Sequence, residues 1–332
     1  MISKKKSAIV AALLNTPMTN KTIMSKDSKI YVAGHTGLAG SALWRLLQKK
    51  GYTNVIGKTH KELDLEDEAA VRAFFKKEKP EFVFIAAAKA GGIKDNSEKP
   101  AEFIYKNLRM QNNLIDASHQ EGVKKLLFLG SACIYPRLAP QPMEESSYMT
   151  GALEPTNEAY AIAKIAGIGM CQSYRKQYGA DFISVMPNNL YGPNDHFELE
   201  RSHVIPALIR KFDDAKREGK SEITLWGSGS PIREFLHADD LASACLFLME
   251  HYSDREFLNV GTGVGTTIKE LSELMQEVVG FEGKIIWDTT KPDGMPIRLL
   301  STKKIEALGW KPSIDLKTGL KETYTWFKEN IK

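Results

Sequence analysis

Cysteine is scarce in this chain of 332 residues, and its three copies stand far apart, at Cys133, Cys171 and Cys245. Three scattered thiols provide neither a disulfide framework nor a thiolate metal site, so we expect a reducing, cytoplasmic setting. The seven histidines show no metal-ligand spacing, and we predict no metal site. Long hydrophobic runs are also missing, because no stretch approaches the roughly 18 apolar residues that span a bilayer.

The chain has no excess of one charge once its N-terminus is set aside. The net charge is +4, but residues 1–26 contain five lysines and no acid. Without these five lysines the chain has 40 basic and 41 acidic residues, which gives no reason to expect nucleic acid or a membrane as a partner. We predict that residues 1–25 form a disordered leader or follow an upstream start codon. The short apolar run at 8–14 leaves a targeting peptide as the alternative.

From Lys29 onward, short β-rich runs alternate with amphipathic helical patterns. The clearest predicted elements are strands at 29–33, 82–88, 125–131 and 181–186 and helices at 38–50 and 100–120. This alternation predicts an α/β fold with a doubly wound parallel sheet of the Rossmann type. We place a dinucleotide-binding domain at 26–190 and a smaller, mainly substrate-binding domain at 191–332, from which about 232–262 returns to the first.

Three glycines at a spacing of three residues follow the first predicted strand. The loop is Gly34, His35, Thr36, Gly37, Leu38, Ala39 and Gly40. At such a turn the backbone can approach a pyrophosphate, and the N-terminus of the next helix offers N–H groups. The loop therefore predicts a dinucleotide site. Its spacing differs from G-x-G-x-x-G, and a tight turn without a ligand is the alternative.

A short strand is predicted at 54–56, and its end carries cations where NAD-binding proteins usually place an acid. Lys58 and His60 lie in this stretch, which favours the 2′-phosphate of NADP(H). A solvated, lysine-rich loop is the alternative. Asp64, beside Leu65, could accept a hydrogen bond from the adenine amino group or could cap the next helix.

A tyrosine and a lysine stand four residues apart on one face of a predicted helix, at Tyr160 and Lys164. A phenol with a pKa of about 10 is a poor proton relay at neutral pH, and a nearby ammonium would lower that pKa. Alone, the pair would be an ordinary surface feature. Ser131, however, ends a predicted parallel strand, at the edge where such sheets bind ligands. Together the three residues form a candidate catalytic set.

The glycine turn, the strand-end serine and the Tyr-x-x-x-Lys pair, in this order, resemble the short-chain dehydrogenase/reductases. Longer motifs resemble the GDP-L-fucose synthases, and the similarity extends over residues 24–332. The motifs are at 130–136, 154–164, 189–193, 202–208, 226–229, 233–237 and 291–294. The resemblance implies an NADP(H)-dependent enzyme that epimerises C3 and C5 of GDP-4-keto-6-deoxy-D-mannose and then reduces C4.

The resemblance also implies roles for individual residues. Ser131 and Tyr160 would hold the C4 oxygen, Lys164 would support Tyr160, and Cys133 and His203 would transfer the protons at C3 and C5. The alternatives are that Cys133 is a small buried apolar residue and that His203 only caps its helix. Further cofactor contacts are implied at Leu129, Gly130, Ser131, Lys164, Pro187, Asn188, Asn189, Leu190 and His203.

For the GDP end of the substrate, the resemblance implies Lys211, Trp226, Arg233 and Asp293. An arginine suits a diphosphate and a tryptophan suits packing on a ring. Trp226 could instead belong to the core, and Lys211 could be a solvated helix residue. Thr36 and His60 stand where some members carry arginine, so discrimination between NADP and NAD is expected to be weaker or differently built here.

Two other functions remain open. The first is a sugar-nucleotide 4-epimerase or dehydratase of the same superfamily. A dehydratase would carry an acidic pair where this chain has Ala132 and Cys133, and a 4-epimerase would have no use for Cys133 and His203. The second is a non-catalytic NADP-sensing protein, which would be expected to lose Tyr160 or Lys164. A homodimer through helix 100–120 and the helix of Tyr160 is expected from the resemblance.

Overall fold

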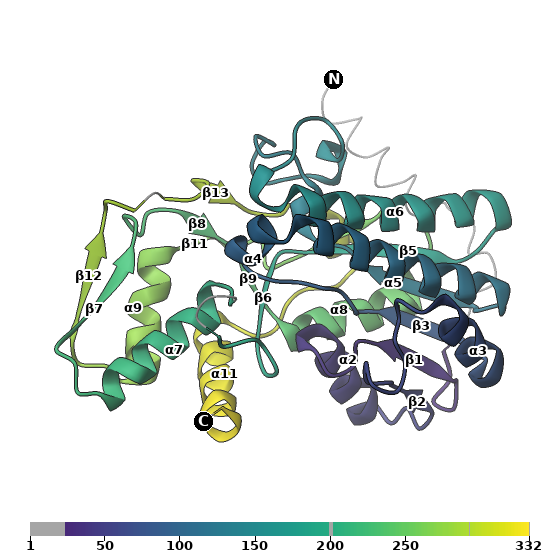
Figure 1. The fold of residues 1–332 in the computed structure, drawn as a ribbon, viewed down its shortest axis with the longest axis horizontal. Helices are drawn as coiled ribbons and strands as arrows, with labels where there is room; N and C mark the ends of the chain where they lie inside the picture. Colours follow the sequence, from purple (N-terminus) through teal and green to yellow (C-terminus); the bar gives the residue numbers. More distant parts are fainter. Residues whose placement is uncertain (1–23, 199–201, 292, 332) are drawn as a thin grey trace.

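The computed structural model describes residues 24–198, 202–291 and 293–331. Most of the predicted leader, residues 1–23, lies outside this range. A six-stranded parallel sheet with the order β10-β5-β4-β3-β1-β2 forms the centre of the larger part of the molecule (Figure 1). Its strands are β1 (Ile30–Ala33), β2 (Val55–Ile56), β3 (Phe82–Ile85), β4 (Lys125–Leu129), β5 (Phe182–Pro187) and β10 (Leu258–Val260).

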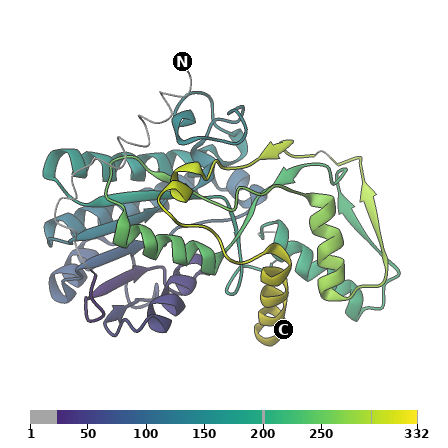
Figure 2. The ribbon, with the colours of Figure 1, turned by 180° about the vertical axis from the view of Figure 1, so that it is seen from behind.

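Helices cover both faces of this sheet, because β1, β3, β4 and β5 are continuous buried runs that need partners on each side. On one face, Leu43 of α2 (Leu38–Lys49) and Leu241 of α8 (Ala238–His251) join the core. The other face is covered by α3 (Glu68–Glu78), α5 (Pro100–Gln120) and α6 (Glu158–Tyr178). Figures 1 and 2 show α5 and α6 side by side. The predicted doubly wound α/β fold is confirmed.

A second, smaller group of elements has a core of its own, on the left of Figure 1. Phe212, Leu271 and Phe327 are buried there, one from each of three helices. The helices are α7 (Val204–Arg217), α9 (Ile268–Val279) and α11 (Leu316–Asn330), which pack with the parallel strands β7 (Glu222–Trp226) and β12 (Lys284–Asp288). Beside them lies a small sheet of β11 (Thr266–Thr267), β8 (Ile232–Arg233) and β13 (Ile297–Arg298).

A buried carboxylate joins the two parts of the molecule. Glu234 is fully buried and accepts hydrogen bonds from Asn188 Nδ2 at 2.9 Å, Gly263 N at 2.8 Å and Leu300 N at 2.8 Å. Asn188 follows the last residue of β5, whereas Leu300 follows β13. Three donors compensate for the burial of this carboxylate, so the large sheet and the small sheet are held in a fixed relation.

The predicted helix at 100–120 is confirmed to the residue, whereas two predicted strands are too long. The strand predicted at 82–88 ends at Ile85, and that predicted at 125–131 ends at Leu129. In both, the residues beyond the strand form loops at the carboxyl edge of the sheet. The short elements α4 (Ile93–Glu98), α10 (Lys303–Ala307), β6 (Asn189–Tyr191) and β9 (Phe235–His237) were not predicted. None of the described helices has the length and apolarity required to cross a membrane.

Candidate active site

The turn between β1 and α2 allows a ligand to approach the backbone closely. Gly34 has a φ of +83°, and a Cβ there would lie 2.7 Å from Ala87 N. A Cβ at Gly40 would lie 2.0 Å from Gly34 O. No side chain caps α2 after Gly37, and its first turn holds no acid. The first N–H groups of the helix can therefore bind an anion, and the turn fits a dinucleotide pyrophosphate.

The other residues of this loop surround the turn. Thr36 is exposed at the tip, and Leu38 and Ala39 are half-buried against the first core. The His35 ring lies over Gly57, where a Cβ would approach it to 2.4 Å, and its Nδ1 is buried without a partner. Burial lowers the pKa of His35, so the ring is neutral near pH 7 and can offer one hydrogen bond to a ligand.

The predicted 2′-phosphate loop contains an acid that the sequence interpretation did not consider. Glu62 accepts hydrogen bonds from Thr59 N and Oγ1, both at 2.8 Å, and its other oxygen lies 3.6 Å from Lys58 Nζ. The His60 side chain is 79% exposed and lies 3.7 Å from Asp64 Oδ1. Both predicted cations therefore have acidic neighbours, which a 2′-phosphate would have to displace or tolerate.

Asp64 does not cap the next helix, so that alternative is wrong. Asp67 caps α3 by accepting a hydrogen bond from Ala70 N at 3.0 Å. Asp64 accepts a hydrogen bond from Glu66 N at 2.9 Å, and its side chain is about half exposed. Leu65 packs against the second core. The position of Asp64 leaves carboxylate surface available for an adenine amino group, which remains a prediction.

Four of the predicted residues meet at the carboxyl end of β4. Ser131 precedes a short 3-10 turn, η1 (Ala132–Ile134), and accepts a hydrogen bond from Cys133 N at 3.4 Å. The Ser131 hydroxyl acts as a hydrogen-bond donor to the Tyr160 phenol. Lys164, one turn later on α6, donates to Leu129 O at 2.7 Å and lies 5.8 Å from the centroid of the Tyr160 ring. The strand end, the turn and the helix thus form one polar cluster.

Gly130 allows this strand end to pack closely. A Cβ at Gly130 would lie 2.3 Å from Met186 Cε on the neighbouring strand β5. The predicted cofactor residues after β5 lie at the same edge of the sheet: Pro187 ends the strand, Asn189 Nδ2 donates to Glu234 O at 3.0 Å, and Leu190 packs on the first core. Because parallel strands end together, these segments lie on the ligand-binding edge of the sheet.

Burial dominates the electrostatics of the cluster. It raises the pKa of Tyr160, which the hydrogen bond from Ser131 lowers only in part. Lys164 does not lower the pKa of Tyr160 as the sequence led us to expect. Its ammonium donates to Leu129 O and lies over the face of the tyrosine ring. Burial also lowers the pKa of Lys164 to about 8 and raises that of Cys133. At neutral pH the tyrosine is therefore protonated and the lysine mostly charged.

His203 precedes the first residue of α7, but its side chain makes no capping hydrogen bond, so the capping alternative is wrong. The ring is exposed to solvent, yet the surrounding protein atoms lower its pKa by desolvation, with a smaller effect from His196. No hydrogen bond or ion pair among the described residues joins this ring to the Ser131 cluster. Its action together with Cys133 therefore stays a prediction.

Trp226 lies on the surface of the smaller part, so the core alternative is wrong. Its side chain is 69% exposed at the end of β7. Lys211 Nζ lies 5.9 Å and Lys291 Nζ 5.5 Å from its ring centroid. Lys211 is half-buried and burial lowers its pKa, unlike a solvated lysine. Lys291 was not singled out from the sequence, although the motif at 291–294 contains it. An exposed aromatic ring with two cations close to it suits a base with attached phosphates.

Asp293 supports this surface. Its two oxygens accept hydrogen bonds from Ser228 N at 2.9 Å and Ser228 Oγ at 2.6 Å. A Cβ at Gly227, whose φ is +81°, would lie 2.3 Å from Asp293 Oδ1. Arg233 Nη1 donates to Ile232 O at 2.9 Å and Met295 O at 2.6 Å. Asp293 thus holds the turn that follows Trp226.

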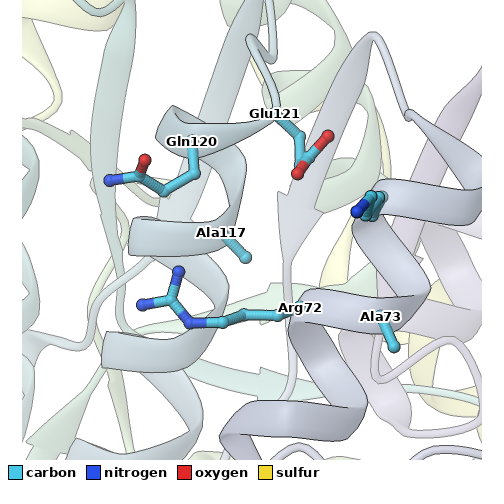
Figure 3. A pocket seen from close by; sticks show the side chains of 6 residues that line it. Arg72, Ala73, Ala117, Gln120 and Glu121 are labelled. Atoms are coloured by element: carbon cyan, nitrogen blue, oxygen red, sulfur yellow. The ribbon is translucent and has the colours of Figure 1, made fainter.

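The hollow shown in Figure 3 is separate from this site. It has a volume of about 260 Å³ and lies between α3 and the end of α5. Arg72, which extends across it in Figure 3, is already paired with Glu68 at 2.9 Å and Asp116 at 2.8 Å. No predicted site residue lines it. We therefore assign the functional site to the carboxyl edge of the sheet and the facing surface of the smaller part.

Comparisons with known proteins agree over most of the chain. Residues 30–261 match the NAD dependent epimerase/dehydratase family. The chain is 57% identical over 310 residues to GDP-L-fucose synthase 1 of Arabidopsis thaliana, covering 93% of this chain and 96% of that protein. It is 50% identical over 316 residues to the GDP-L-fucose synthase of Escherichia coli (strain K12), covering 92% and 98%. A structure of a GDP-L-fucose synthetase from Naegleria fowleri bound to NADP has a TM-score of 0.87 at 29% identity, covering 94% and 98%.

Proposed function

The chain belongs to the NAD dependent epimerase/dehydratase family and, within it, to the GDP-L-fucose synthases, and we propose that it converts GDP-4-keto-6-deoxy-D-mannose to GDP-L-fucose with NADPH. The observation that carries this proposal is the cluster at the end of β4. This cluster combines hydrogen-bond donors for a ketone oxygen, from Ser131 and Tyr160 with Lys164 beside them, with the thiol of Cys133. A reductase would need only the hydrogen-bond donors, whereas epimerisation also needs groups, such as the thiol, that exchange protons with carbon.

Epimerisation uses the acidity of the carbons beside the ketone. C3 and C5 both lie α to the C4 carbonyl, so either proton can leave if the enolate oxygen is stabilised. Ser131 and Tyr160 supply two hydroxyl donors for that oxygen. Cys133 takes or returns a proton on one face of the sugar ring, and His203 acts on the other. The lowered pKa of His203 allows it to exist as a neutral base near pH 7.

Reduction uses the same oxygen. NADPH, when bound, supplies the hydride for C4. Tyr160 donates the proton to the C4 oxygen, and its raised pKa keeps that proton in place until the oxygen becomes basic. Lys164, charged at neutral pH, stabilises the phenolate that remains. Gly34 and Gly40 would let the pyrophosphate of NADPH approach the backbone, and Lys58 and His60 would hold its 2′-phosphate.

The GDP end of the substrate lies on the surface of the smaller part in this proposal. Trp226 offers an exposed ring for stacking the guanine base, and Lys211 beside it offers a cation. Arg233 binds the diphosphate, because a planar guanidinium matches two phosphate oxygens. Asp293 acts through the turn at Gly227 and Ser228, which it holds by hydrogen bonds.

We further propose that the protein is a cytoplasmic homodimer that pairs α5 and α6 with their counterparts. Tyr105 on α5 and Ile162 on α6 support this arrangement, because their side chains are 56% and 41% exposed. Sedimentation of the wild type and of Ile162→Glu tests the interface, since a charge in a dimer contact would favour the monomer. The division at residue 190 into a cofactor domain and a substrate domain, with 232–262 returning to the first, also stays part of the proposal.

The test is to mix purified protein with NADPH and the 4-keto sugar, follow loss of NADPH absorbance, and identify the product by NMR. GDP-L-fucose is the expected product. Cys133→Ser should impair epimerisation, whereas Cys171→Ser, which alters a thiol buried in the second core, should leave the product unchanged. Oxidation of NADPH to give an unepimerised 6-deoxy sugar would remove Cys133 and His203 from their roles. No oxidation by folded protein would contradict the proposed reaction.

A further inference from the structure

Arg298 reaches the catalytic turn from the smaller part of the molecule. It lies on β13, where it pairs in parallel register with Arg233 of β8. Its Nη2 donates to Ala132 O at 2.9 Å. Ala132 stands between Ser131 and Cys133, so the hydrogen bond is made to the backbone that carries both side chains. The sequence alone gave no role to Arg298, because more than 160 residues separate it from the turn it contacts.

Arg298 and its neighbour Arg233 are cations that lie side by side on two strands. Within 24–198, 202–291 and 293–331, neither Arg298 nor Arg233 forms an ion pair with a carboxylate. The buried acid next to Arg233 in the chain, Glu234, accepts hydrogen bonds from amide groups instead. Two adjacent cations without an acid are unfavourable, and burial together with Arg298 lowers the pKa of Arg233. Such an arrangement is typical of sites where a negative charge must be stabilised.

The Cys133 thiol lies in this turn, and its burial opposes ionisation to the thiolate. It is 6% exposed, and burial raises its pKa. The groups that act on it are the Ser131 hydroxyl, the Arg298 guanidinium, the Lys164 ammonium and the neutral Tyr160. Lys164 is committed to Leu129 O, and its own pKa of about 8 means that it loses its charge in mild base. Arg298 is therefore the permanent cation at this thiol.

We propose that Arg298 is a positioning residue that holds the turn of Cys133 and stabilises its thiolate. The part of this inference that concerns epimerisation rests on the proposed function. In that step the thiolate takes a proton from the carbon beside the ketone and becomes a thiol. The electron pair of the broken C–H bond forms the carbon–carbon double bond of the enolate, and the carbonyl π pair moves to the C4 oxygen, where Ser131 and Tyr160 donate hydrogen bonds. Epimerisation is completed when a proton reaches the carbon from the opposite face, where the proposed function places His203, and proton exchange with solvent then restores both groups.

The first experiment titrates the thiol directly and needs no substrate. Thiolate absorbance is measured against pH as the difference between each protein and its own Cys133→Ser counterpart. Arg298→Gln keeps an amide donor for Ala132 O but removes the charge, and it should raise the Cys133 pKa by about one unit or more. Arg298→Lys should restore most of the lowering. Arg233→Met, a neighbour directed at other carbonyls, is the matched control and should leave the thiol near its wild-type pKa.

The second experiment follows exchange at carbon. The protein is incubated in D₂O with the 4-keto sugar and no NADPH, and deuterium at C3 and C5 is measured by NMR over a range of pH. The limb on which the exchange rate rises with pH, which follows formation of the Cys133 thiolate, should move to higher pH in Arg298→Gln. A residue that only bound diphosphate would raise KM and leave that limb in place.

A folded Arg298→Gln protein with the wild-type Cys133 pKa would overturn the inference, as would an Arg298→Lys protein with a Cys133 pKa as high as that of Arg298→Gln. If the Cys133 pKa rises in Arg298→Gln but the wild type exchanges no deuterium, the link between Arg298 and Cys133 is supported. The absence of exchange would at the same time refute the proposed epimerisation. The two ideas therefore fail in distinguishable ways.

Discussion

Lys164→Met is expected to slow reduction strongly while leaving the fold at least as stable as the wild type at pH 7. The Lys164 side chain is 3% exposed, and burial lowers its pKa from an ordinary 10.5 to about 8. At about 1.4 kcal/mol per unit, holding the charged form in the folded state costs about 3 kcal/mol. The ammonium also donates one hydrogen bond, to Leu129 O, worth about 1.5–3 kcal/mol. Methionine removes both effects, so the unfolding free energy should stay equal or rise by up to about 1.5 kcal/mol.

The pH dependence of the unfolding free energy gives a more specific test of the role of Lys164. Because the folded pKa of Lys164 is depressed, its penalty is fully present below pH 8 and is lost as the pH rises towards 10.5. The unfolded state binds more protons over this window, so stability rises with pH. Relative to Lys164→Met, the wild type should therefore gain about 2 kcal/mol in unfolding free energy between pH 7 and 9.5. The difference between the two proteins cancels the titration of groups that they share.

The assay pairs urea unfolding at both pH values with NADPH oxidation. Reduction by Lys164→Met should fall by about 10²–10⁴-fold, the range for losing general acid–base assistance. Lys125→Met is the matched control, because Lys125 is also buried but donates to Leu248 O, Met249 O and Tyr252 O at the end of α8. It should lower stability by about 2–3 kcal/mol and leave the activity of folded molecules unchanged. A strongly destabilised Lys164→Met without the pH-dependent difference would refute the reasoning.

Three further predictions concern binding. Glu62→Gln keeps a hydrogen-bond acceptor for Thr59 but removes the charge that pairs with Lys58. The Kd for NADPH should therefore fall up to about fivefold, while that for NADH should not change. Calorimetry that shows an equal fall in both Kd values would contradict this. Trp226→Ala removes an exposed ring, so KM should rise by about 5–150-fold with kcat and melting temperature nearly unchanged, and Trp226→Phe should recover part of the loss. Gly40→Ala places a Cβ against Gly34 O and should abolish NADPH binding measured by fluorescence; retained binding would show that the turn can relax.

The parts of the fold that were predicted from sequence are those that local patterns determine. Helix 100–120 begins at a proline and buries one face, so both its type and its limits follow from the chain itself. β6, β8, β11 and β13 contain two or three residues each, too few for a period to be visible. Their existence depends on distant partners, such as Arg298 of β13 lying beside Arg233 of β8. Such pairing cannot be deduced from composition or spacing.

The candidate site divides in the same way. The catalytic cluster could be anticipated because Ser131 ends a strand and Tyr160 and Lys164 lie one helical turn apart, so each position follows from a local element. Arg298 and Glu62 could not, since Arg298 contacts a residue 166 positions away and Glu62 turns back on the loop before it. Raised pKa values for Tyr160 and Cys133 also depend on three-dimensional burial, which no local pattern measures.

The junction at Glu234 limits how this protein can be recombined with its relatives. Its carboxylate needs donors from Asn188, Gly263 and Leu300, which come from three separate stretches of the chain. A chimera with a single crossover near residue 190 would take Asn188 from one parent and the other three residues from the second. Exchange of substrate specificity between relatives would then require these four positions to be transplanted as a set, or a buried charge would lose its partners.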